Sequence, residues 1–219
     1  MIYFENEHFF VINKPAGIAV QSANPDDPTV ENYIKKNYNS HIHLVNRIDQ
    51  PVSGFCLIAK NSYSKNYLWK IQIDKEIKKR YIAVVEGHLE PTEEKIVLYL
   101  KKVEKLAKSI VKEEPTEDYK RCVIKIKRSF FLDNYTILEI DLKTGRYHQI
   151  RAMLSHLGHP IKGDVKYGAR RKNKDRSIYL HSWKLAFVPP GQEEKLHLRA
   201  PLNMTNPLWR LVDKIIKHW

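Results

Sequence analysis

The chain has 219 residues, 42% hydrophobic and 11% aromatic, which allows a sizeable core and excludes the composition of a disordered protein. No run of about 18 apolar residues occurs, and the acidic start differs from a signal peptide, so we expect a cytoplasmic protein without a membrane span. The net charge of +13 favours a polyanionic partner, with nucleic acid ahead of an anionic membrane. A lysine-rich solvated surface is the plain alternative.

The basic residues recur along the chain and do not form one terminal tail. Such a spread fits a long phosphate track. The segments are residues 75–80, 101–108, 120–128 and 169–176. The two cysteines, Cys56 and Cys122, lie in apolar or alternating stretches, and without a C-x-x-C pair we expect buried thiols and no zinc ribbon.

The first predicted elements alternate between strand and helix. Residues 9–13 predict a strand that ends at the turn K-P-A-G, residues 14–17. Asp27-Pro28 predicts the start of a short helix that runs to residue 38. Residues 54–60 are a continuous apolar run and predict a buried strand. Asn61 or Ser62 then caps a second helix.

Strands dominate the middle of the chain. Residues 80–86 predict a strand ended by Gly87. Residues 122–127 and 135–142 both alternate with period two, and the Asp133-Asn134 pair between them predicts a hairpin.

The last third returns to a mixed pattern. Residues 146–149 open a predicted helix after Gly145, and Gly158 and Pro160 end it. Residues 177–188 and 195–198 predict strands, and residues 206–219 predict an amphipathic helix. This order predicts an α+β fold with a largely antiparallel sheet. Neither a dinucleotide-binding nor a P-loop motif is present.

The stretch N-R-I-D-Q-P-V-S-G-F, residues 46–55, places one carboxylate near an arginine and just ahead of an apolar strand. Pro51 restricts Gln50 to extended geometry, and Gly54 relieves crowding at the entry to the strand. Asp49 therefore lies on a stiff loop. It is either a turn aspartate that accepts backbone hydrogen bonds or a carboxylate presented for chemistry, and local features leave both possibilities open.

A second stretch, residues 142–169, gathers cations at the start of a predicted helix. Arg146 and Arg151 lie where a helix dipole also favours anions. Arg151 adjoins the apolar stripe, so we expect it to be partly buried and to need a carboxylate partner, for which Asp49 is the candidate. Two surface arginines are the alternative. The histidines of this stretch lack further ligands at the spacing of a metal site, so we expect no metal.

The third stretch, residues 78–87, starts an apolar strand with Tyr81 directly after three cations. An aromatic ring with flanking cations can stack on a base while its neighbours hold phosphate. A half-buried tyrosine at a strand edge is the alternative interpretation.

Together these motifs resemble those of the RluA family of RNA pseudouridine synthases. Members of this family typically show K-P-x-G, H-R-L-D-x-x-T-S-G, K-x-Y-x-A-x-V-x-G, G-R-T-H-Q-I-R, G-H-P-I-x-G-D-x-x-Y-G and L-H-A in this order. The chain shows K-P-A-G, N-R-I-D-Q-P-V-S-G, K-R-Y-I-A-V-V-E-G, G-R-Y-H-Q-I-R, G-H-P-I-K-G-D-V-K-Y-G and L-H-S over roughly residues 1–200. The departures include Asn46 for His, Val52 for Thr, Tyr147 for Thr and Ser182 for Ala.

The resemblance implies a fold and a reaction. It implies the pseudouridine synthase fold, a mixed sheet flanked by helices with a cleft across it. It also implies one catalytic domain over residues 1–219 in a short form without an S4 domain. Uridine in rRNA or tRNA would become pseudouridine without a cofactor or metal, and the protein would act as a monomer.

The resemblance also implies the roles of individual residues. Asp49 is the catalytic carboxylate, either as a nucleophile or as a base at C2′. Arg151 pairs with it, and Tyr81 stacks on the uracil as a candidate acceptor of the C5 proton. Arg47 fills the stack that a flipped base leaves, and Leu180 packs in the active site. Further RNA contacts are expected from Arg146, His148 and Gln149.

Two other function classes remain as alternatives. A catalytically idle RNA-binding protein of the same fold would keep the scaffold without turnover, although the complete set of Asp49, Tyr81 and Arg151 argues against it. A metal-dependent nuclease or deaminase lacks the ligands that such a site needs.

Overall fold

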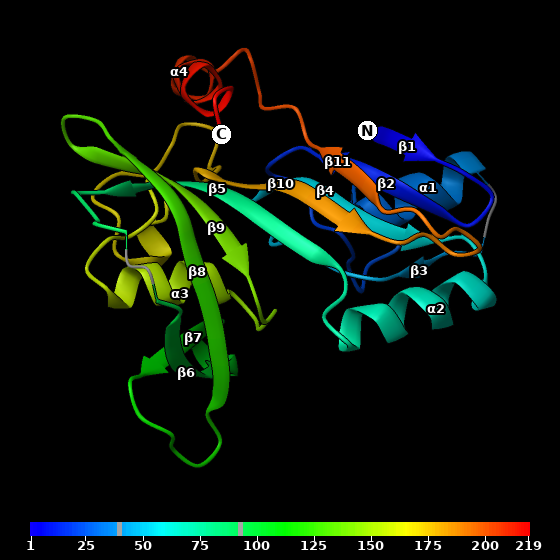
Figure 1. Ribbon diagram of the computed structural model, residues 1–219, viewed down its shortest axis with the longest axis horizontal. Helices are drawn as coiled ribbons and strands as arrows, with labels where there is room; N and C mark the ends of the chain where they lie inside the picture. The colour runs from blue at the N-terminus through cyan, green and yellow to red at the C-terminus, as the bar shows by residue number, and fades with distance from the viewer. Residues whose placement is uncertain (39–40, 92–93) are drawn as a thin grey trace. The chain divides into compact units, whose positions relative to one another are not determined.

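The computed structural model describes residues 1–38, 41–91 and 94–219 (Figure 1). The chain divides into two compact units, which we call unit 1 and unit 2. Unit 1 comprises Met1–Lys79 and His181–Pro201, and unit 2 comprises Arg80–Leu180 and Leu202–Trp219. The expectation of a single catalytic domain without an S4 domain stays a prediction.

Unit 1 is built on strands in the order β1-β2-β4-β10, with β3 paired to β4 and β11 paired to β10. These pairs are antiparallel except β4–β10, which is parallel. Helix α2 covers one face of the strands and contributes Leu68 and Ile71 to a core with Phe9, Phe55 and Phe187 (Figure 1). The elements are β1 (Ile2–Glu5), β2 (Phe9–Lys14), α1 (Val30–Tyr38), β3 (His43–Leu44), β4 (Ser53–Ala59), α2 (Ser62–Ile73), β10 (Leu180–Phe187) and β11 (Leu196–Arg199).

Unit 2 contains strands in the order β5-β9-β8-β6-β7. The pairs β8–β9, β6–β8 and β6–β7 are antiparallel, and α3 packs against β7 (Figure 1). The elements are β5 (Lys78–Glu86), β6 (Ile96–Val103), the 3-10 turn η1 (Glu104–Leu106), β7 (Lys108–Lys112), β8 (Lys120–Phe131), β9 (Tyr135–Leu142), α3 (Gln149–His156), the 3-10 turn η2 (Val165–Tyr167) and α4 (Pro207–Ile216). Mixed, largely antiparallel strands with helices confirm the predicted α+β class.

Two helices begin later than the sequence predicts. Helix α1 begins at Val30, because the Thr29 hydroxyl oxygen accepts a hydrogen bond from the Asn32 amide at 3.1 Å and caps the helix. Helix α3 begins at Gln149 and not at residue 146, because His148 adopts a left-handed backbone with φ 52°. The predicted cap Asn61 is confirmed, since its side chain accepts from the Ser64 amide at 2.8 Å.

Four strands were not predicted from the sequence: β1, β3, β6 and β7. The first two are short. The other two form a hairpin, residues 96–112, which carries lysines in place of a clean alternation. We call this segment the basic hairpin. A charged strand near the end of a sheet is favourable because it discourages further pairing, but the same charge weakens the hydrophobic pattern that reveals a strand.

Candidate active site

Asp49 lies in a tight turn immediately before β4. Its carbonyl accepts a hydrogen bond from the Val52 amide at 3.0 Å, and Val52 is 2% exposed. The side chain of Asp49 is half-buried. The turn is therefore anchored at its far end by the burial of Val52, and the carboxylate stands on the short connection between Ile48 and Gln50.

Lys14 supports this turn through hydrogen bonds of its buried ammonium group. Its ammonium group is fully buried and donates hydrogen bonds to the carbonyls of Pro15 at 2.9 Å, Ile18 at 2.7 Å and Gln50 at 3.1 Å. Burial lowers the pKa of Lys14 to about 8. The lysine thus joins the K-P-A-G turn to the residue that follows Asp49. Sequence reasoning missed this role, although a lysine at the end of an apolar strand is a usable signal.

A second pair of hydrogen bonds joins the same two turns. The Gly17 amide donates to the Gln50 carbonyl at 2.8 Å, and the Gln50 side-chain amide donates to the Gly17 carbonyl at 3.0 Å. Gln50, the residue after Asp49, is therefore held by two hydrogen bonds to its carbonyl and one from its side chain, all with the K-P-A-G turn. Such a loop keeps a carboxylate in place with little loss of entropy on binding.

Asn46 and Ser53 fix the two ends of the Asp49 loop. The Asn46 side-chain oxygen accepts from the Leu57 amide at 2.8 Å, which ties the start of the loop to β4. The Ser53 hydroxyl lies 2.8 Å from Nδ1 of His181, whose Nε2 lies 3.4 Å from the Ala200 carbonyl. Burial lowers the pKa of His181 to about 4, so the neutral ring donates through Nε2 and accepts the Ser53 proton at Nδ1.

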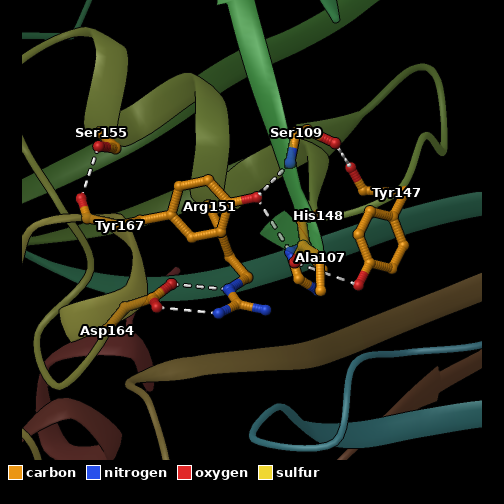
Figure 2. A network of polar contacts seen from close by, with 8 residues as sticks. All are labelled: Ala107, Ser109, Tyr147, His148, Arg151, Ser155, Asp164 and Tyr167. Carbon is orange, nitrogen blue, oxygen red and sulfur yellow. Dashed lines mark hydrogen bonds and ion pairs between the residues drawn. The ribbon is translucent and has the colours of Figure 1, made fainter. Parts of the chain in front are cut away.

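Arg151 is held in unit 2 by a bidentate ion pair with Asp164. Its Nε lies 2.6 Å from one carboxylate oxygen and its terminal nitrogen lies 2.9 Å from the other (Figure 2). Both residues are buried, with 4% and 2% of their surface exposed. The sequence predicted burial and a carboxylate partner, but it did not identify Asp164. Asp49 belongs to unit 1, so its pairing with Arg151 stays a prediction.

The guanidinium of Arg151 lies over the ring of Tyr167, whose hydroxyl contacts His148. The Arg151 guanidinium carbon lies 5.0 Å from the centre of the Tyr167 ring, and the Tyr167 hydroxyl lies 2.9 Å from Nδ1 of His148 (Figure 2). Burial, followed by the Arg151 charge, lowers the pKa of His148 to about 3. The imidazole is therefore neutral near pH 7, and Arg151 carries the positive charge at this position.

Tyr81 lies on β5 in unit 2 with 6% of its surface exposed. The cations before it have partners on the protein: Lys79 donates to the Gln72 side chain at 2.7 Å, and Arg80 donates to the buried Glu139 at 2.7 Å. The Lys79 contact lies within unit 1 and the Arg80 contact lies within unit 2, and each fixes one residue at the start of β5. The expected stacking of Tyr81 on uracil stays a prediction.

The residues expected to contact RNA differ in exposure. Arg47 and Arg146 are exposed, and Arg47 donates to the Gln21 side chain at 3.1 Å. Leu180 is buried, with 3% exposed, at the start of β10. His148 is also buried and contacts Tyr167 as described above. Their roles toward RNA stay predictions.

Gln149 is buried and its amide is engaged within the turn before α3. Its side-chain oxygen accepts from the Thr144 hydroxyl at 2.8 Å and from the Arg146 amide at 3.0 Å, and its nitrogen donates to the Val123 carbonyl at 3.2 Å. These bonds stabilise the turn that presents Arg146. The expected contact of Gln149 with RNA stays a prediction.

Both cysteines are buried thiols, as predicted. Burial raises the pKa of Cys56 to about 12 and that of Cys122 to about 11, which keeps both protonated. Within residues 1–38, 41–91 and 94–219 no group of three or more His, Cys, Asp or Glu side chains is arranged to hold a metal ion. Over the same residues no helix has the length and apolar character needed to cross a membrane.

Comparison with known proteins decides the family. Residues 8–156 match the family described as RNA pseudouridylate synthase. The chain belongs to this family. It is 35% identical over 217 residues to the ribosomal large subunit pseudouridine synthase C of Buchnera aphidicola subsp. Acyrthosiphon pisum, covering 93% of this chain and 67% of that protein. Predictions of an RNA pseudouridine synthase and an isomerase are thereby confirmed at the level of the family.

Another relative is named for a different RNA. The tRNA pseudouridine synthase C of Vibrio parahaemolyticus is 29% identical over 225 residues, covering 93% of this chain and 91% of that protein. The solved structure of human RNA Pseudouridylate Synthase Domain Containing 1 has a TM-score of 0.76 at 20% identity, covering 95% of this chain and 85% of that one. It confirms the pseudouridine synthase fold, whereas the expected cleft across the sheet stays a prediction.

Proposed function

We propose that this protein isomerises specific uridines in rRNA or tRNA to pseudouridine and that Asp49 is the catalytic carboxylate. Membership of the RNA pseudouridylate synthase family carries the proposal, and the braced loop around Asp49 supports the choice of residue. Curated relatives are named for both kinds of RNA, so the two substrates stay together in the proposal.

The proposed reaction breaks the bond from N1 of uracil to C1′ of ribose and forms a bond from C5 to C1′. The proton on C5 is lost and N1 gains one, so no oxidant or reductant is needed. Asp49 acts either by attack or as a base at C2′, and both need one fixed carboxylate. Arg151 orients that carboxylate, Tyr81 stacks on the uracil and Leu180 packs against it.

The substitution Asp49→Asn tests the catalytic role. We expect it to lower the rate of pseudouridine formation by at least about 10³-fold, because a neutral amide can neither attack nor remove a proton. Release of tritium from 5-³H-uridine RNA measures turnover, and filter binding measures RNA affinity, which should stay within about twofold of wild type.

The matched control is Asp74→Asn, which changes an exposed aspartate at the end of α2 in the same unit. It should leave both the rate and the affinity unchanged. Substantial activity in Asp49→Asn would overturn the assignment of the carboxylate. Binding without turnover in the wild-type protein would point to the idle RNA-binding alternative.

We also propose that Arg47 helps to flip the target base out of a stem. Arg47 is exposed in the segment that leads to Asp49, and a side chain that inserts into a base stack must be exposed. Arg47→Ala should slow turnover roughly tenfold on a uridine in a stem and less than about twofold on an unpaired uridine, because flipping costs a few kcal/mol only in the stem. Arg210→Ala, an exposed arginine of α4, is the control. Equal losses on the two RNAs would exclude the role.

The protein is further proposed to act in the cytoplasm as a monomer. Light scattering coupled to size-exclusion chromatography checks the second point, since a monomer has a mass near 25.9 kDa.

A further inference from the structure

Tyr167 contacts the Arg151 centre through its ring, its hydroxyl and its main chain. The ring centre lies 5.0 Å from the Arg151 guanidinium carbon. The hydroxyl oxygen lies 2.8 Å from the Ser109 amide nitrogen and 2.9 Å from Nδ1 of His148, while the Tyr167 carbonyl accepts from the Ser155 hydroxyl at 2.6 Å (Figure 2). With 7% of its surface exposed, Tyr167 is fixed from three directions.

The Tyr167 hydroxyl bridges two buried groups, the Ser109 amide and the His148 ring. The Ser109 amide can only donate, so the Tyr167 oxygen accepts there. The same hydroxyl shares a hydrogen bond of 2.9 Å with Nδ1 of the neutral His148. Removing the hydroxyl would leave a buried amide and a buried ring nitrogen without this partner, and both would have to move or be solvated. The Tyr167 hydroxyl therefore sets the distance between β7 and the turn before α3.

Ser109 makes this network part of the basic hairpin. Its hydroxyl donates to the Tyr147 carbonyl at 2.6 Å, which is a second link from β7 to the turn that carries His148 (Figure 2). Lys102 lies 4.8 Å from the centre of the Tyr147 ring, and Lys108 lies 5.6 Å from the centre of the Tyr167 ring. The hairpin has five lysines and one acid. An RNA phosphate bound to these lysines would therefore pull on β7, which contacts Tyr167 through the Ser109 amide.

We propose that Tyr167 is a positioning residue for Arg151, and that the position of the basic hairpin sets the orientation of the guanidinium through Tyr167. Two contacts orient the guanidinium: Asp164 holds one edge of it through Nε and a terminal nitrogen, and the guanidinium carbon lies over the Tyr167 ring. The inference rests on the proposed function in that it takes Arg151 to orient the catalytic carboxylate. It adds a residue and an element that act on the reaction by orienting Arg151.

The first test is Tyr167→Phe, which removes the hydroxyl and keeps the ring over Arg151. We expect the single-turnover rate at saturating RNA to fall roughly tenfold, the scale of one buried hydrogen bond, while the Kd for RNA stays within about twofold. Both are measured at a temperature well below the unfolding midpoint of each variant, so that a loss of folded protein does not mimic a loss of rate.

A spectroscopic signal reports on Arg151 itself. The Nε–H of Arg151 donates to Asp164 at 2.6 Å, so its resonance in a ¹H–¹⁵N spectrum should be shifted and slow to exchange with solvent. Arg151→Lys assigns the resonance, because that variant lacks it. Tyr167→Phe should move the resonance and speed its exchange, and this arm needs no RNA.

The control is Tyr179→Phe, which removes another buried tyrosine hydroxyl of unit 2, one that donates to Asn206 at 3.0 Å. It should leave the rate and the Arg151 resonance unchanged. Ser109→Ala is a milder second variant. It keeps the hydrogen bond from the Ser109 amide to Tyr167 and removes only the hydrogen bond from the Ser109 hydroxyl to Tyr147. It should lower the rate by roughly two- to threefold and move the resonance in the same direction.

Three outcomes would overturn the inference: an unchanged rate in Tyr167→Phe, a rate and an affinity that fall together, or a lower rate with an unmoved Arg151 resonance. If Tyr167→Phe fails to fold, Ser109→Ala and its resonance decide. If the wild-type protein forms no pseudouridine, the proposed function fails, and the resonance alone decides whether Tyr167 positions Arg151.

Discussion

Lys14 is a fully buried cation whose ammonium group has three carbonyl acceptors. Burial of a charge is unfavourable, and the three acceptors offset only part of that cost, as the lowered pKa of about 8 indicates. The residue nevertheless connects two turns, and one of them carries Asp49. Lys14 therefore fixes the position of the Asp49 turn at a cost in folding stability.

Linkage makes this cost measurable. The pKa of Lys14 is about 8 in the folded state against its ordinary value of 10.5, so the unfolded state binds more protons between these values and the free energy of unfolding should rise with pH there. We expect wild type to gain about 2 kcal/mol relative to Lys14→Met between pH 7.5 and 10. Urea unfolding of both proteins across this range measures the gain.

Below about pH 7 both states carry the charged lysine, and the difference between the two proteins should be constant. Lys79, whose pKa is also lowered to about 8 by burial, is present in both proteins and cancels in the comparison. A difference that does not change with pH would contradict the prediction.

At the scale of elements, the parallel contact between β4 and β10 decides how closely two strands of unit 1 approach. Gly54 pairs with Ser182 and has φ +103°, and a Cβ added at Gly54 would lie 2.3 Å from the Ser182 carbonyl oxygen. Only glycine fits both the backbone angle and the space. The Asp49 loop therefore leads into β4 where the Ser182 backbone lies directly against Gly54.

Gly54→Ala should lower the free energy of unfolding by about 3–5 kcal/mol, since the strain of a positive φ adds to the clash with backbone. The matched control is Gly145→Ala, because a Cβ there meets nothing within 4 Å, and it should change stability by less than about 1 kcal/mol. Urea denaturation measures both. Equal effects of the two substitutions would show that the close approach of Ser182 does not matter.

At the scale of the whole molecule, most of the net charge of +13 lies in unit 2, which has 25 Lys and Arg against 15 Asp and Glu, whereas unit 1 has 13 against 10. Three of the four basic segments, residues 101–108, 120–128 and 169–176, lie in unit 2 together with Arg151. Many weak contacts with phosphates give affinity without sequence information, because each cation releases a counterion from the RNA.

The affinity for RNA should therefore depend steeply on salt. With about four phosphate contacts, Kd should rise roughly 50- to 150-fold between 50 and 200 mM salt. Fluorescence anisotropy with a labelled RNA measures it, and the free energy of unfolding over the same range serves as the control for protein stability. A rise of less than about threefold would show that charge is not the main source of affinity.

Local pattern predicted most of this fold. The strands at residues 9–13, 54–60 and 80–86 appear as β2, β4 and β5, and the Asp133-Asn134 hairpin joins β8 to β9. Apolar periodicity and turn residues act over a few positions, so they can be read directly. The basic hairpin was missed because its lysines break the alternation, and its place beside α3 depends on contacts far along the chain.

The amino-acid sequence by itself determined the α+β class, the family and a candidate set of Asp49, Tyr81 and Arg151, because short motifs and periodicity are local properties. Tertiary structure alone decided that Asp164 holds Arg151, that Lys14 braces the loop of Asp49, and that Tyr167 joins His148 to Ser109. A buried polar group must find its partner wherever the chain brings one. That partner is 13 positions away for Arg151, 36 for Lys14 and 58 for the Ser109 amide, and no local pattern identifies it.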